Sequence, residues 1–318
     1  MEQESELCFP QLLNASCRRP AAPQPEALLA YILLFIISLL AATLNLLVII
    51  SISHFRQLRS PTNHLLLSLA VSDLLVVLLV MPVEVLLTGT CWVLGDLVCA
   101  LYFFLPVTLI SASVGNMVLI SVDRYVAVCD PLHYPTRITH RLVCVGVCVC
   151  WICSFCYSVL LLSDHLQQPG RYNSCSGECV VSIAGDVDLV VAFIIPISVI
   201  VVLYVRVFVV AVTQARATRS QLSVTVKIRR SELKAARTLG VVVAVFLICY
   251  SPYYCLSLTG GNIVIGSSAE AAMSFLMYFN SCLNPLIYAL LYPWFRRAIR
   301  LIVTLQILQP DSCETSML

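Results

Sequence analysis

The stretch ALLAYILLFIISLLAATLNLLVIISIS, residues 27–53, carries no charged side chain. A helix needs about 20 apolar residues to cross about 30 Å of hydrocarbon. Because backbone groups in lipid must be hydrogen-bonded within the segment, this stretch predicts a membrane-spanning helix. Six further runs have the same character, and Asp73 is the one charge among them: 64–83, 97–122, 142–163, 189–205, 238–269 and 271–295. The sequence therefore predicts an all-α membrane protein, a seven-transmembrane helix bundle.

Composition and charge placement agree with this fold class. Of 318 residues, 60% are hydrophobic and 11% charged, whereas a soluble domain carries about 25% charged residues. With the N-terminus outside, sixteen of the nineteen Lys and Arg residues fall on the cytoplasmic side, as the positive-inside rule requires. We expect an extracellular tail over residues 1–26, a membrane domain over 27–292, and a short amphipathic helix with a cytoplasmic tail over 293–318. That basic inner face is suited to contact lipid headgroups.

The predicted outer side carries signals for covalent modification. The first residues, MEQESELCFP, are acidic and do not resemble a cleavable signal peptide. Asn14 begins an Asn-Ala-Ser sequon, which predicts N-glycosylation of the outer tail. Disulfides are expected in this oxidising compartment, although spacing alone does not give their connectivity. The cysteines available are Cys8, Cys17, Cys91, Cys99, Cys175 and Cys179.

Polar residues inside the apolar runs require a reason. A central Asp such as Asp73 costs about 2.5–3.5 kcal/mol on insertion scales. Ser113, Asn280, Ser281 and Asn284 are expected at comparable depths. One interpretation is a polar cluster that joins helices. The other is a sodium site, since carboxylate, hydroxyl and amide oxygens suit a hard cation. The residues alone do not decide between them.

The stretch SVDRYVAV, residues 121–128, ends the third run at the inner face. Asp123 is expected to neutralise much of the charge of Arg124. Glu232, in the stretch RRSELKAARTL, would reach the same Arg124 if the two helices meet, and that contact would form a two-state element. The alternative is an Arg that extends from the helix end to water and has no switching role.

These features together resemble a rhodopsin-like (class A) G-protein-coupled receptor. The matching elements, in chain order, are Asn45, LAVSD (69–73), Cys99, DRY (123–125), Trp151, Pro196, CYSP (249–252) and NPLIY (284–288). The stretch NSCLNPLIYALLYPWF, residues 280–295, is further similar to the fingerprint of trace amine-associated receptors. The resemblance covers essentially residues 27–305.

The resemblance implies a fold, partners and a site. It implies a plasma-membrane receptor for a small-molecule amine in olfaction, coupled to a heterotrimeric G protein of the stimulatory or olfactory type that raises cyclic AMP. It also implies the disulfides Cys99–Cys179 and Cys17–Cys175, with Cys8 as an alternative to Cys17. The implied activation residues are Asp123, Arg124, Tyr125, Tyr204, Glu232, Tyr250, Pro252, Asn284, Pro285 and Tyr288.

One departure from the family bears on the ligand. Aminergic receptors usually hold the ammonium with an Asp seven residues after the cysteine at the outer end of the third membrane helix. That cysteine is Cys99 here, and the residue seven positions later is Pro106. Some fish members of the family resemble this sequence in carrying the acid in the fifth membrane helix. In this sequence Asp188 stands there, eight residues before Pro196. A cation about 4 Å from Asp188 would gain about 4 kcal/mol at an effective dielectric near 20, before desolvation. Asp186, about 200° round the helix, is expected in solvent.

Other residues of the expected pocket follow from the same resemblance. Tyrosine rings contribute about 0.5–2 kcal/mol each to ammonium binding, although aromatic residues near the interface also serve as membrane anchors. Two outer acids would suit a diamine or polyamine. The expected ligand-binding residues are Asp188, Tyr253, Tyr254, Tyr278, Pro106, Val107, Ile110, Glu84 and Glu270.

Two alternatives concern the ligand and the class of protein. Asp188 would be an interfacial acid favoured by its helix dipole if the receptor bound a non-amine ligand. No nucleophile with a base and no HExxH metal set lies in the runs, so we expect no enzyme. We also expect no cofactor apart from the sodium ion, and no nucleic-acid partner.

Overall fold

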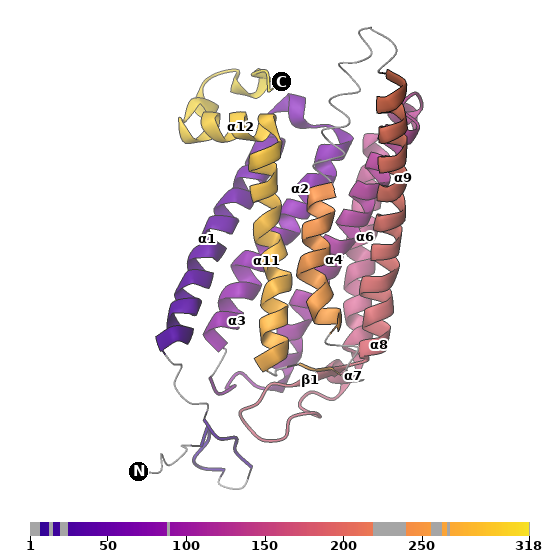
Figure 1. Ribbon diagram of the computed structural model, residues 1–318. Helices are drawn as coiled ribbons and strands as arrows, with labels where there is room; N and C mark the ends of the chain where they lie inside the picture. The colour runs from indigo at the N-terminus through magenta and orange to yellow at the C-terminus, as the bar shows by residue number, and fades with distance from the viewer. Residues whose placement is uncertain are drawn as a thin grey trace.

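The computed structural model describes residues 7–12, 15–19, 25–87, 90–218, 240–255, 263–265 and 268–317. Its long helices run side by side as a bundle, and α12 lies across the end opposite the N-terminus (Figure 1). The main helices are α1 (Pro25–His54), α2 (Pro61–Leu75), α3 (Met81–Leu87), α4 (Asp96–Cys129), α6 (His140–Leu161), α9 (Ile195–Thr218), the helix Gly240–Cys255, and α11 (Ser268–Leu291).

In the described part of the chain, each of the seven predicted runs contains a helix. Five are long and apolar enough to cross a membrane by length and composition: Tyr31–His54, Pro61–Glu84, Asp96–Cys129, His140–Leu161 and Gly185–Val210. A sixth candidate is Phe275–Leu291, which continues into Pro293–Val303 through a bend of 98°. Gly240–Cys255 is shorter, and residues 219–239 before it lie outside the described part.

Helix α4 lies at the centre of the bundle, in contact with α2, α6 and α9. Many large apolar side chains point away from the bundle, such as Leu160 and Ile248, which are 73% and 67% exposed. In water such a surface would be unfavourable, whereas in lipid it is not. The described bundle is therefore built for a bilayer.

Two π turns lie next to prolines near the outer end of the bundle. The first covers Val76–Val80, between α2 and α3, and the second covers Leu189–Ile194, between α8 (Gly185–Asp188) and α9. Pro82 and Pro196 follow closely after them. Proline lacks an N–H and its ring clashes with the carbonyl four residues earlier, so the helix must widen or bend at such a place.

A small sheet at the outer end was not predicted. β1 (Val181–Ile183) pairs antiparallel with β2 (Ile263–Ile265), and Val181 lies opposite Ile265. The prediction that residues 238–269 form one span was therefore wrong at its C-terminal end. That segment lacks charge, but it is β-branched and follows two glycines, a composition that favours a strand.

Three disulfides tie the outer segments together. Cys99–Cys179 and Cys17–Cys175 are the pairs that the resemblance implied. The third, Cys8–Cys91, was not foreseen, and it occupies the tail cysteine that had been the alternative to Cys17. Asn14, the expected glycosylation site, lies outside the described residues.

The helix after the bundle, α12 (Pro293–Val303), has one apolar and one basic face. Phe295 and Ala298 are buried in a cluster with Phe55 and Leu58. Arg296, Arg297 and Arg300 are exposed. This arrangement suits a helix that lies along the inner leaflet. The remaining short helices are α5 (Tyr134–Arg137), α7 (Ser163–Gln167), and 3-10 turns at Arg56–Leu58, Gln306–Leu308 and Ser312–Glu314.

The Cys8–Cys91 bridge is expected to stabilise the folded state. It joins residues 83 positions apart, and removal of a long-loop disulfide typically costs about 2–4 kcal/mol. Purified Cys8→Ser/Cys91→Ser protein in detergent should unfold at a lower temperature than wild type. Cys148→Ser, which removes an exposed free thiol on α6, is the control. Equal unfolding temperatures for all three proteins would contradict the prediction.

Candidate functional site

A cavity of about 980 Å³ lies among the helices and reaches the outer end of the bundle. Its walls come from α3, α4, α6, α8, α9, α11 and the helix Gly240–Cys255, with contributions from the N-terminal tail. Eight of the nine expected ligand-binding residues line it: Asp188, Tyr253, Tyr254, Tyr278, Pro106, Val107, Ile110 and Glu84. The ninth, Glu270, is in the first turn of α11, and its side chain lies outside the described part.

Asp188 is buried in this cavity, with 6% of its surface exposed, whereas Asp186 is exposed. The Tyr157 hydroxyl donates a hydrogen bond of 2.5 Å to Oδ1 of Asp188, and Tyr254 also bonds to that carboxylate. Among the described residues no Lys or Arg forms an ion pair with Asp188. A buried charge is costly unless it is paired, so the two hydroxyls leave the carboxylate suited to a cationic ligand.

Aromatic packing fixes the side chains around the carboxylate. The ring of Tyr254 stacks on Phe193 of the π turn at a centroid distance of 4.4 Å. Tyr253 meets Tyr254 edge to face at 5.1 Å. Tyr253, Tyr254 and Tyr278 are each at most 8% exposed. Rings held in this way can stabilise an ammonium group without first being ordered.

Tyr157 was missed in the sequence. It lies on α6, where Ser154, Tyr157 and Leu161 all line the cavity. Their spacing of three and four residues places them on one helix face. That pattern alone could have suggested a stripe on α6 that carries two hydroxyl groups, from Ser154 and Tyr157. Nothing in one sequence indicates that the stripe faces Asp188, because the two residues are 31 positions apart.

Glu84 has a partner within the cavity. It lies in α3, and its carboxylate accepts a hydrogen bond from the Tyr102 hydroxyl of α4. The outer end of the cavity therefore carries a second acid, and that acid is linked to α4.

Deeper in the bundle, the predicted polar cluster is assembled around Asp73, which is fully buried. Ser113 donates to Oδ1 of Asp73 at 3.2 Å, and Asn284 donates to Oδ2 at 2.8 Å. Asn284 also donates to Asn280 Oδ1 at 3.4 Å, and Ser281 bonds to Asp73. These contacts join α2, α4 and α11, as expected of polar groups that hold membrane helices together.

The same cluster also fits a small cation. Within the described part, Asn284 Oδ1 is buried without a hydrogen-bond partner, and such a group carries a desolvation penalty. The Asp73 carboxylate and the hydroxyls of Ser113 and Ser281 that bond to it supply oxygen donors, which a hard cation prefers. The two interpretations of this cluster are thus compatible.

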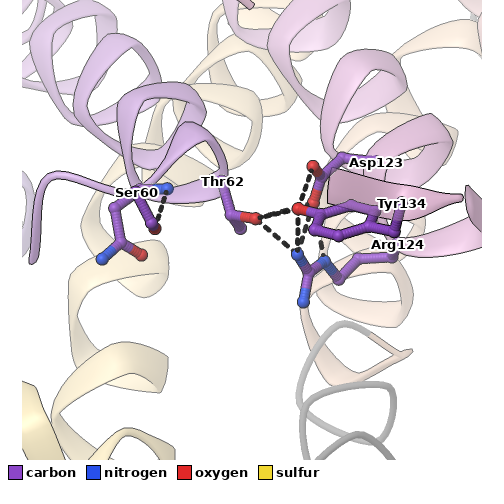
Figure 2. A network of polar contacts seen from close by, with 6 residues as sticks. Ser60, Thr62, Asp123, Arg124 and Tyr134 are labelled. Carbon is purple, nitrogen blue, oxygen red and sulfur yellow. Dashed lines mark hydrogen bonds and ion pairs between the residues drawn. The ribbon is translucent and has the colours of Figure 1, made fainter. Parts of the chain in front are cut away.

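At the inner face, Arg124 is held by a network from three elements (Figure 2). Its guanidinium donates to Asp123 Oδ2 at 2.8 Å from Nε and to Thr62 Oγ1 of α2. Tyr134 of α5 donates to Asp123 Oδ1 at 2.9 Å. Burial raises the pKa of the Tyr134 hydroxyl above its usual value, so at neutral pH it is a protonated donor. This network holds the Arg124 side chain against Asp123 of its own helix, Thr62 of α2 and Tyr134 of α5.

The remaining expected activation residues that the structure describes lie on α4, α9, α11 and the helix Gly240–Cys255. Tyr250, immediately before Ser251 and Pro252, stacks on Phe246 at 4.2 Å. Tyr288, in the α11 turn after Pro285, is 2% exposed. Tyr125 packs near Val207 of α9. Glu232 lies outside the described residues, so its contact with Arg124 stays a prediction.

Tyr204 of α9 packs against the first residue of the helix Gly240–Cys255. A Cβ placed on Gly240 would lie 1.8 Å from the Tyr204 hydroxyl. No side chain fits at Gly240 while Tyr204 keeps this position. Movement of that helix would therefore change the packing around Tyr204.

The comparison with known families decides what this bundle is. The model of the seven-transmembrane receptors of the rhodopsin family matches residues 44–288. The chain belongs to this family. It is therefore a receptor and not an enzyme, and it is a multi-pass membrane protein that signals through a G protein in response to a ligand.

Known relatives place the receptor more narrowly. It is 38% identical to trace amine-associated receptor 13c of Danio rerio, in an alignment that covers 98% of this chain and 96% of the relative. It is 36% identical to trace amine-associated receptor 4 of Mus musculus, with 99% and 96% covered. The receptor is thus related to the trace amine-associated receptors over its whole length.

The Tyr134 contact predicts an effect on basal signalling. Tyr134→Phe removes the donor to Asp123 and should weaken the network that holds Arg124. A typical hydrogen bond contributes about 0.5–1.5 kcal/mol, which corresponds to about a two- to tenfold shift between states. Basal G-protein activation in membranes, corrected for surface expression, should rise by that factor. The same change at Tyr172, in an outer loop, is the control. No rise for Tyr134→Phe would show that the network does not favour the resting state.

Proposed function

We propose that this receptor is an olfactory-type receptor for volatile or water-borne amines, and that it binds the ammonium through Asp188. The observation that carries the proposal is a buried carboxylate, bonded to hydroxyl groups, in a cavity lined by tyrosines. In this proposal the Asp188 carboxylate replaces the acid that aminergic receptors usually carry at the position of Pro106. The names of the relatives support an amine ligand.

In this proposal the ammonium shares the carboxylate with Tyr157. The tyrosine hydroxyl takes Oδ1, which leaves lone pairs on Oδ2 for the ligand. A carboxylate accepts about four hydrogen bonds, so ligand binding does not require the Tyr157 bond to break. Tyr157 would orient the carboxylate, while Tyr253, Tyr254 and Tyr278 surround the ammonium.

Activation follows from a difference in affinity between two states. An amine can shift the receptor only as far as it prefers the active state. In the proposed active state, the helix that contains Tyr250 and Pro252 swings outward, Tyr204 and Tyr288 rearrange, and Arg124 leaves its network to meet the G protein. We propose a stimulatory or olfactory G protein, with a rise in cyclic AMP at the plasma membrane.

The Asp73 cluster is proposed as a sodium site coupled to this change. The ligands would be Asp73, Ser113, Asn280 and Ser281. Its position between α2, α4 and α11 suits an ion that holds these helices in the resting arrangement.

The amine proposal predicts a loss of response in Asp188→Asn. A hydrogen bond to a charged group contributes about 1.5–3 kcal/mol, so the concentration for half-maximal cyclic AMP should rise at least about tenfold. The test is a panel of mono-, di- and polyamines in transfected cells at matched surface expression. Asp186→Asn, two residues away and exposed, is the control and should respond as wild type. Unchanged potency in Asp188→Asn would remove Asp188 as the counterion.

If the ligand carries a second ammonium group, we expect the outer acids Glu84 and Glu270 to bind it. If the ligand is a diamine or polyamine, Glu84→Gln or Glu270→Gln should weaken the response to diamines by about tenfold. The response to monoamines should not change. Binding of diamines that is unaffected by both substitutions would contradict this role.

The alternative is a receptor of the same fold for a non-amine ligand, in which Asp188 is not a counterion. It would be favoured by a wild-type receptor that ignores the whole amine panel and responds to neutral odorants.

A further inference from the structure

The cavity that holds Asp188 does not end at the ligand-binding residues. It continues toward the inner half of the bundle between α4 and α6, from the π turn Leu189–Ile194. We call this part the side groove, and define it by Gly115, Leu119, Gly146, Val149, Cys153 and Val191. None of these residues is charged or belongs to the site described above.

The side groove is open to the bilayer. Val149 and Val191 are 51% and 44% exposed, on helices whose outer faces are apolar. Gly115 lets α4 and α6 pack closely at one edge of the groove, because a Cβ on Gly115 would lie 2.4 Å from Cys150 Sγ. A Cβ on Gly146 would reach only to 3.7 Å from Leu119. The groove is thus lined by apolar side chains, two of which are partly exposed on the face that a bilayer would cover.

The side groove is long compared with a small amine. From Tyr157, which bonds to Asp188, to Gly146 the chain covers eleven residues of α6. At 1.5 Å per residue this is about 16 Å. A short amine at Asp188 would leave most of this length to other molecules.

The outer end of the same cavity is lined by the N-terminal tail. Cys8, Cys17 and Arg18 all contribute to its wall, and two disulfides hold the tail in place. Access from water therefore passes beside the anchored tail, whereas access from lipid passes through an open groove.

We infer that the receptor takes amphiphilic amines, whose ammonium binds Asp188 while a long hydrocarbon chain lies in the side groove. This inference rests on the proposed role of Asp188 and adds the class of amine. The continuity of one cavity from a carboxylate to an uncharged groove carries the argument. An ammonium group in the side groove would be costly, because none of the residues that define the groove is charged, whereas a hydrocarbon chain there would not be.

The first test locates the hydrocarbon chain of the bound amine. The probe is dodecylamine with a diazirine at the chain end, cross-linked to the purified receptor in lipid nanodiscs and mapped by mass spectrometry. Cross-links are expected on the side groove, on α6 between Gly146 and Cys153, and should be lost in Asp188→Asn. Cross-links elsewhere would overturn the inference. So would cross-links that persist in Asp188→Asn or form equally with the matched alcohol, because the groove would then hold any lipid chain.

The second test blocks the groove. Val149→Trp should raise the half-maximal concentration of dodecylamine at least about tenfold, since each buried methylene contributes about fourfold in affinity. The response to butylamine should not change, which also shows that the variant is folded. Ile152→Trp is the control, because Ile152 is on the same helix and 62% exposed but lines no part of the cavity. An equal shift for both amines, or no shift, would contradict the inference.

The two tests separate this inference from the proposed function. If short amines signal through Asp188 but no cross-link forms in the groove, the proposed function stands and the inference fails. If the cross-link forms in an Asp188-dependent way but no amine raises cyclic AMP, the side groove stands as the binding site for the hydrocarbon chain and the signalling proposal fails.

Discussion

The burial of one carboxylate sets the chemistry of the outer pocket. Asp188 is 6% exposed and receives hydrogen bonds from hydroxyl groups on two other helices. A charge in such surroundings is stable only if its neighbours remain in place. Tyr157 therefore ties α6 to α8, and Tyr254 ties the helix Gly240–Cys255 to the same point. Any cation that enters this pocket acts on three helices together, which is what a receptor requires to convert binding into helix movement.

The same physical rule organises the inner half of the bundle. Asp73 joins α2, α4 and α11 through amide and hydroxyl groups, and Asp123 joins α4 to α2 and α5. Each acid is buried, and each is satisfied by partners from different helices. Because removing one partner leaves a buried polar group unsatisfied, these contacts exist in discrete arrangements. They are suited to a switch between two states rather than to gradual movement.

Much of the fold could be predicted from the sequence because lipid allows so few solutions. Runs of about 20 residues that cross lipid must be helices, and the basic residues predict their orientation. The burial of Asp188 and the exposure of Asp186 follow from helical periodicity. The Cys8–Cys91 bridge and the β1–β2 pair could not be predicted: both join segments distant in sequence, and the family resemblance, which implied the more distant Cys17–Cys175 bridge, implied neither. Tyr157 was missed for the same reason: its partner lies on another helix, and only the packed structure brings the two together.

The measurement that tests the central claim most directly is a structure of the receptor with a bound primary amine, determined by electron cryomicroscopy. Our account predicts the amine nitrogen within about 2.7–2.9 Å of the Asp188 carboxylate, with the Tyr157 hydroxyl still bonded to that group. An amine nitrogen at Glu84 or Glu270, with Asp188 bonded to the tyrosines alone, would contradict it.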